Sequence, residues 1–227
     1  MNPQTLSLQH LITLPRQPTV QPPVAVLLHG VGSDEHALLK VLEPALDPRF
    51  LTVSVRAPYS LQPRGYGWFH VEFSAQGPTI QPEEAEESRR NLLAFIPELL
   101  QAYPLNAQRV FLVGFSQGAI LAASVALSAP PGLIAGTAML SGRVLPELSP
   151  HLAPPEHLRQ RPFFVAHGRG DATLPIHHAR ATRISLANLG VNQTYLEYEA
   201  GHEIVPAMLT DLRLWHAALL ERKSAVA

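Results

Sequence analysis

Short, continuous apolar runs recur along this 227-residue chain, and they leave it few possible folds. Runs of consecutive apolar residues are typical of strands that a parallel sheet buries on both faces. Residues 193–198 instead alternate apolar with polar side chains, as an edge strand does. Together the runs predict six strands, at residues 24–29, 51–55, 109–113, 137–140, 162–167 and 193–198.

Segments with helical periodicity separate these predicted strands. Residues 82–102 begin with a proline and four glutamates, which favour a helix start, and then place apolar residues at spacings of three or four. Residues 204–222 have the same spacing and predict a terminal helix packed against the sheet. The alternation predicts an α/β fold, a doubly wound and mostly parallel sheet with helices on both faces.

Three segments fit neither pattern: residues 1–19, 58–82 and 143–162. We expect the last two to be loops above the sheet. Prolines interrupt both, so neither offers the continuous apolar face that a large helical lid needs. The length of the chain suits a single domain, residues 1–227, built around one sheet.

Composition and charge exclude several classes of function. The chain is 46% hydrophobic and 15% charged, as globular domains are, and its net charge is only -1. Its 17 basic residues are scattered, so we expect no nucleic-acid partner. The absence of cysteine removes disulfides and a thiol nucleophile.

Neither membrane insertion nor secretion is predicted. The most apolar stretch, residues 118–140, is broken by two prolines, so we expect a helix, a turn and a strand there. The first 20 residues have no basic start followed by an apolar run, so we expect no secretion signal and a cytoplasmic location.

The clearest chemical motif is Gly114-Phe115-Ser116-Gln117-Gly118, which matches G-x-S-x-G. It follows a predicted strand and precedes a predicted helix at residues 119–129, the context in which a sharp turn exposes a nucleophilic serine. The alternative is an ordinary strand-to-helix turn in which the serine only caps the helix. The position of the motif between a strand and a helix favours Ser116 as a nucleophile.

A serine nucleophile needs a histidine base and an acid that orients the histidine. In this context the acid and then the base follow the serine along the chain. Of the four aspartates, only Asp171 follows Ser116 and precedes a histidine that comes directly after a predicted strand. That histidine is His202, so we predict Asp171 as acid and His202 as base. The alternative for Asp171 is a solvated loop carboxylate.

The adjacent histidines His177 and His178 raise the possibility of a metal site. Neighbouring residues on a helix point about 100° apart, and no second ligand pair has a matching spacing. We therefore expect no metal and no cofactor.

A tetrahedral intermediate needs two backbone N–H donors. One is expected from Gln117, directly after the nucleophile, and the other from the loop after the first buried strand. In that loop Val31 lies between two glycines and is our candidate. The alternative is that the loop is only a strand-ending turn.

With these elements in place, the sequence resembles the phospholipase/carboxylesterase family of α/β-hydrolases, which includes acyl-protein thioesterases. The resemblance lies in five blocks between residues 24 and 220: residues 28–32, 68–69, 114–118, 167–175 and 201–204. The sequence departs from the family pattern at His70, where aspartate is common, and at Val31, where leucine is usual. It also has Ala119 where a glycine often stands.

The resemblance implies an α/β-hydrolase fold without a large lid and a cofactor-free esterase with the same site residues. It also implies a small-molecule ester substrate, an apolar groove and a possible homodimer. We expect Trp68, Phe69 and Leu174 to contact the substrate. The function predicted is hydrolysis of carboxylic esters through an acyl-enzyme; lysophospholipids or acyl thioesters are alternative substrates. An alternative of another class is a binding module that has lost catalysis.

Overall fold

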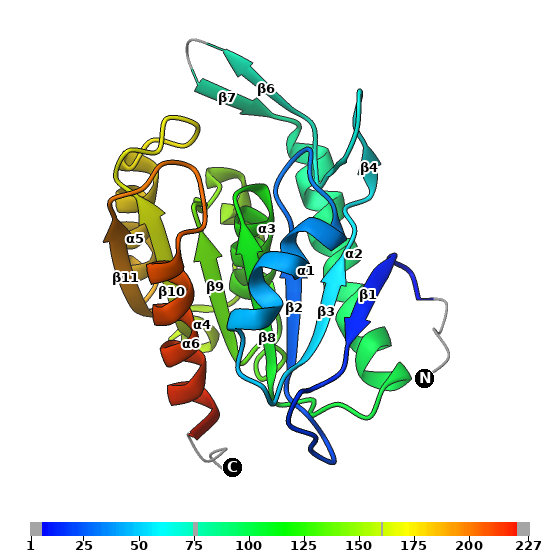
Figure 1. The fold of residues 1–227 in the computed structure, drawn as a ribbon. Helices are drawn as coiled ribbons and strands as arrows, with labels where there is room; N and C mark the ends of the chain where they lie inside the picture. Colours follow the sequence, from blue (N-terminus) through cyan, green and yellow to red (C-terminus); the bar gives the residue numbers. More distant parts are fainter. Residues whose placement is uncertain (1–5, 75–76, 160, 222–227) are drawn as a thin grey trace.

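Seven strands form the central sheet of the computed structural model, which describes residues 6–74, 77–159 and 161–221. Their order across the sheet is β1-β3-β2-β8-β9-β10-β11 (Figure 1). All neighbours pair in parallel except β1, which pairs antiparallel with β3. The strands are β1 His10–Thr13, β2 Val24–Leu28, β3 Leu51–Val55, β8 Val110–Phe115, β9 Gly136–Leu140, β10 Pro162–Gly168 and β11 Asn192–Tyr198.

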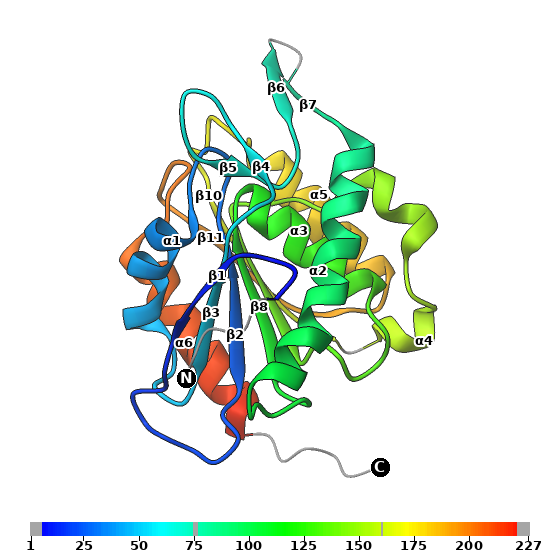
Figure 2. The same ribbon diagram turned by 90° about the vertical axis from the view of Figure 1, so that its right-hand side faces the viewer.

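Helices cover both faces of the sheet (Figure 2). Two of them, α1 and α6, lie on one face, whereas α2, α3 and α5 lie on the other. The bounds are α1 Glu35–Leu42, α2 Pro82–Ala102, α3 Gln117–Ser128, α5 His177–Asn188 and α6 Pro206–Glu221. No helix among the described residues is long and apolar enough to cross a bilayer.

Two separate cores explain why the strands are continuously apolar. Along β2, Val24 and Val26 belong to the core beneath α2 and α3, whereas Ala25 and Leu27 belong to the core beneath α1 and α6. Each strand residue is therefore buried on one face or the other. The predicted α/β architecture is confirmed, and β11 lies at the edge of the sheet as its alternating pattern indicated.

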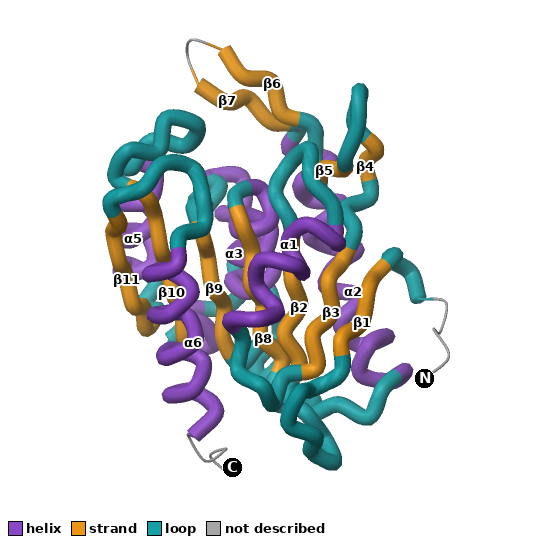
Figure 3. Tube along the Cα trace, in the orientation of Figure 1, coloured by secondary structure: helices purple, strands orange, loops and turns teal. Residues whose placement is uncertain are grey.

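Two of the segments that the sequence left unassigned contain short strands. Within residues 1–19, β1 extends the sheet at its other edge, and its four residues are only half-buried. Within residues 58–82, which we expected to be a loop, two hairpins rise above the carboxyl ends of the sheet (Figure 3). They pair β4 (Tyr59–Ser60) with β5 (Tyr66–Gly67), and β6 (Val71–Ser74) with β7 (Gly77–Ile80).

The prediction that residues 143–162 form a loop above the sheet is wrong for most of that segment. It joins the parallel neighbours β9 and β10, so it must return along the sheet to its opposite end. On the way it forms two short helices, η2 (Pro146–His151) and α4 (Pro155–Leu158). Only its first residues stay near the carboxyl ends of the strands.

Candidate active site

Ser116 occupies a strained turn between β8 and α3. Its φ of 54° and ψ of -117° are unfavourable for a residue with a side chain, and such strain concentrates at functional sites. Its amide donates to the Leu140 carbonyl at 2.8 Å, which ties the turn to β9. Its hydroxyl makes no capping hydrogen bond, in contrast to the alternative in which Ser116 only starts the helix.

Glycines on both sides of Ser116 allow β8 and α3 to approach closely. A Cβ atom at Gly114 would lie 2.2 Å from the Gly118 carbonyl oxygen. A Cβ atom at Gly118 would lie 1.9 Å from the carbonyl oxygen of Leu28 in β2. The turn therefore needs glycine at both positions.

A chain of hydrogen bonds connects Ser116, His202 and Asp171. The His202 Nε2 atom lies 2.8 Å from Ser116 Oγ, and its Nδ1 atom lies 2.7 Å from Asp171 Oδ2. Because a carboxylate only accepts, Nδ1 carries the proton of a neutral His202 ring and Nε2 is left to accept from the Ser116 hydroxyl. These three residues come from the carboxyl ends of different strands, as the sequence predicted.

The Asp171 carboxylate is buried and fully engaged. Its Oδ1 atom accepts hydrogen bonds from the amides of Thr173 at 2.9 Å and Leu174 at 2.7 Å. Its side chain has no exposed surface. The alternative of a solvated loop carboxylate does not fit this arrangement.

Beside Asp171 lies a second histidine, His167, which is not among the site residues predicted from the sequence. His167 Nε2 donates to the Leu174 carbonyl at 2.8 Å and lies 3.3 Å from Asp171 Oδ2. Burial lowers the pKa of His167, which favours a neutral ring. His167 thus supports the loop that carries Asp171. In the sequence, only its position four residues before Asp171 could have indicated this role.

The loop after β2 approaches Ser116 from the other side. A Cβ atom at Gly30 would lie 3.3 Å from Ser116 Cβ, so only a small residue leaves the loop undisturbed at this distance. The amide of Val31 has no acceptor within the described part of the chain, and that of Gln117, at the start of α3, has none within its helix. Both residues line the same cavity as Ser116.

His29 anchors this loop. Its Nδ1 atom donates to the Gly30 carbonyl at 2.8 Å, and its Nε2 atom accepts from the Ala57 amide at 3.1 Å. This pattern requires a neutral ring, and burial lowers the pKa of His29 accordingly. The Trp68 indole donates to the His29 carbonyl at 2.9 Å.

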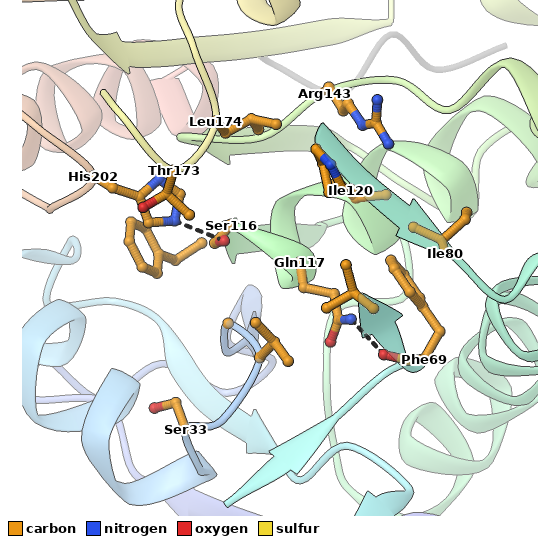
Figure 4. Close-up of a pocket in the computed structure, with 15 residues that line it drawn as sticks. Ser33, Phe69, Ile80, Ser116, Gln117, Ile120, Arg143, Thr173, Leu174 and His202 are labelled. Carbon is orange, nitrogen blue, oxygen red and sulfur yellow. Dashed lines mark hydrogen bonds between the residues drawn. The ribbon is translucent and has the colours of Figure 1, made fainter. Parts of the chain in front are cut away.

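A cavity of about 280 Å³ opens beside Ser116 (Figure 4). The hairpin of β6 and β7 forms one wall, and α3 and the loop after Asp171 form others. Its apolar lining includes Val31, Phe69, Val71, Ile80, Ile120 and Leu174. Such a surface suits an apolar acyl group.

Two of the three predicted substrate contacts, Phe69 and Leu174, line this cavity, but Trp68 does not. Trp68 is completely buried, and both its indole and its amide are used inside the protein, the latter by the Gln117 side chain at 2.7 Å. We therefore assign Trp68 to support of the loop and the turn rather than to substrate contact. His70 is also outside the lining and bonds to Glu84.

Among the described residues, no group of three or more histidine, aspartate or glutamate side chains could hold a metal ion. The rings of His177 and His178 have centroids 4.1 Å apart and are tilted by 39° to each other, and no third candidate ligand in the described part of the chain joins them.

The sheet order, the strained serine turn and the residues at the carboxyl ends of the strands define an α/β-hydrolase fold. Residues 10–218 match the model of the phospholipase/carboxylesterase family, and the chain belongs to this family. The resemblance seen in the sequence motifs is thereby confirmed.

Individual relatives agree with this family. Acyl-protein thioesterase 1 of Neurospora crassa is 28% identical to this chain, in an alignment 236 positions long that covers 93% of this chain and 94% of that protein. The carboxylesterase of Bacillus cereus has the same fold, with a TM-score of 0.79 and 20% identity over 94% of this chain and 95% of its own. A carboxylesterase from Mesorhizobium loti has a TM-score of 0.79 and 23% identity, over 93% and 95% of the two chains.

Proposed function

We propose that this protein is a serine esterase that hydrolyses carboxylic esters through an acyl-enzyme intermediate. The observation that carries the proposal is the continuous hydrogen-bonded chain from Ser116 through His202 to Asp171, at the edge of an apolar cavity. Catalysis by this chemistry needs both a nucleophile with its base and a place for the acyl group.

In the first half of the reaction, Ser116 Oγ attacks the ester carbonyl carbon while His202 Nε2 takes the hydroxyl proton. The amides of Val31 and Gln117 stabilise the oxyanion. His202 then gives its proton to the departing alcohol, and the acyl group remains on Ser116. Asp171 stays ionised and stabilises the imidazolium that forms.

In the second half, a water molecule attacks the acyl-enzyme and gives its proton to His202. The tetrahedral intermediate collapses, the carboxylic acid leaves, and His202 returns the proton to Ser116. The products are one alcohol and one acid, and the enzyme is regenerated.

The size of the cavity favours short or medium acyl chains. At about 280 Å³ it lies just below the usual range for ligand sites in proteins. Acyl thioesters are a second candidate substrate class, because the acyl-protein thioesterase of Neurospora crassa is similar along almost the whole chain. A thioester would pass through the same steps with a thiol as leaving group.

Labelling with a fluorophosphonate probe tests the nucleophile, and hydrolysis of 4-nitrophenyl butyrate tests the activity. We expect the probe to modify Ser116, and Ser116→Ala to lower kcat by roughly 10³-fold or more while the fold is retained. A folded wild-type protein that neither reacts with the probe nor hydrolyses any ester or thioester would instead support the binding-module alternative.

A further inference from the structure

One charged side chain, Arg143, lies in the otherwise largely apolar wall of the cavity. It lies in the loop after β9, separated from the strand by Ser141 and Gly142, and is half-buried. Within the described part of the chain its guanidinium makes no hydrogen bond and no ion pair, and its buried Nε atom has no partner. Glu147 acts on it only at longer range.

An unpaired guanidinium in this position is costly. Arginine carries five N–H donors and stays protonated in proteins, so its charge cannot be relieved by loss of a proton. Burial lowers the pKa of Arg143, which reflects the loss of water around the charge. The missing partner is therefore expected from a ligand in the cavity, and the complement of a planar guanidinium is a carboxylate or phosphate.

The backbone holds Arg143 firmly in place. On one side, Ser141 has a φ of 52° and its amide donates to the Ala166 carbonyl at 2.8 Å. On the other, the Val144 amide donates to the Thr182 hydroxyl at 2.9 Å. Between them, a Cβ atom at Gly142 would lie 2.5 Å from Ala119 Cβ, so the segment is pressed against α3. With the backbone fixed, only the side chain of Arg143 has to become ordered when an anion binds, which limits the entropy lost.

The position of Arg143 relative to His202 indicates which part of an ester it meets. In Figure 4, His202 lies to the left of Ser116, whereas Arg143, Ile120 and Ile80 lie to its right, and all of them line the same cavity. Because His202 must protonate the departing alcohol, the leaving group belongs on its side of Ser116. The acyl chain then extends over Ile120 and Ile80 toward Arg143.

We propose that Arg143 binds a carboxylate at the far end of the acyl chain, so that the preferred substrates are half-esters of dicarboxylic acids. This inference rests on the esterase function proposed above and specifies its substrate class. A phosphate in the alcohol part, as in a lysophospholipid, would lie on the His202 side and would not reach Arg143.

The test uses 4-nitrophenyl half-esters of six-, seven- and eight-carbon dicarboxylic acids. Each is compared with the ester of the same length in which a primary amide replaces the free carboxylic acid. Each pair has nearly the same shape and leaving group and differs in charge. For at least one chain length, we expect kcat/KM to be roughly 10- to 100-fold higher for the carboxylate, the factor expected of charge-assisted hydrogen bonds.

Variants assign the preference to Arg143. Arg143→Met should abolish the carboxylate-to-amide ratio, and Arg143→Lys should retain part of it because the charge remains. Arg213→Met, which removes an exposed arginine on α6, is the control and should keep the wild-type ratio. An acylglycerol phosphate ester as an additional substrate should show no dependence on Arg143.

The outcomes separate this inference from the general function. Wild-type protein that hydrolyses the amide esters but never prefers the carboxylates would overturn the role of Arg143 and leave the esterase intact. A ratio that Arg143→Met does not change would do the same, and so would an Arg143-dependent preference for the phosphate ester alone. Failure to hydrolyse any ester would remove the esterase function and the inference with it.

Discussion

Replacement of His216 by leucine should make the protein more resistant to acid. His216 is fully buried in α6, and its ring packs against Phe50 and Phe111. Within the described structure neither of its ring nitrogens has a hydrogen-bond partner. Burial lowers the pKa of His216 to about 3, although the charge of Asp47 acts in the opposite direction. The folded state therefore keeps this ring neutral.

The pKa difference sets the sign and size of the effect. The free histidine value is 6.5, so the unfolded state binds a proton below this pH while the folded state does not until about pH 3. The stability associated with His216 is complete above pH 6.5 and is lost as the pH falls toward 3. With 1.36 kcal/mol for each pKa unit, the loss is about 2 kcal/mol at pH 5 and on the order of 5 kcal/mol below pH 3.

Urea unfolding followed by far-ultraviolet circular dichroism, at pH 8 and at pH 5, measures this difference. Between the two pH values, His216→Leu should lose about 2 kcal/mol less unfolding free energy than wild type. His177→Gln, at an exposed position in α5, is the control and should follow wild type. The other buried histidines, His29 and His167, remain in both proteins and cannot cause a difference between them. Equal losses in His216→Leu and wild type would therefore refute the reasoning.

Two further predictions concern catalysis. Asp171→Asn should lower kcat on the order of 10⁴-fold, since an amide in place of the carboxylate favours the wrong tautomer of His202, as in other triads. Asp211→Asn should change kcat far less, because this carboxylate accepts from the Tyr198 hydroxyl and does not contact His202; equal losses in the two variants would exclude Asp171 as the acid. The site should also work without a lipid interface, so the rate on a short-chain ester should saturate smoothly as its concentration passes the solubility limit, and a sharp rise there would indicate a lid.

The sheet and the arrangement of the candidate catalytic residues could be predicted because both leave a local mark in the sequence. A strand buried on two faces must be apolar at successive positions, as β2 is. The turn at Ser116 needs glycine at positions 114 and 118, where any side chain would meet backbone atoms. Such requirements act over a few residues, so the residue types alone indicate the conformation.

The remaining strands left no comparable mark. The strand β1 is four residues long and half-buried, and β4 and β5 are only two residues each, too short to show a period. Their pairing depends on partners that are distant in the sequence or on the hairpin turn. The place of Trp68 is hard to predict for a related reason, because an aromatic residue that contacts substrate and one that supports the protein interior can have the same local sequence.

Residues that select a substrate are the hardest to predict, and Arg143, for which we propose such a role, shows why. Its local sequence resembles that of any loop after a strand, and its place in the cavity depends on where β9 lies in the sheet relative to β8. Attack, protonation and oxyanion stabilisation require fixed geometry, so relatives with this chemistry need the same local backbone. Recognition of the acyl chain requires only that some group of suitable charge reach its far end, and several elements could supply it. Membership of the family therefore indicates ester or thioester chemistry, whereas we propose that the choice of ester depends on the cavity walls, namely the hairpin of β6 and β7, α3 and the loop that carries Arg143.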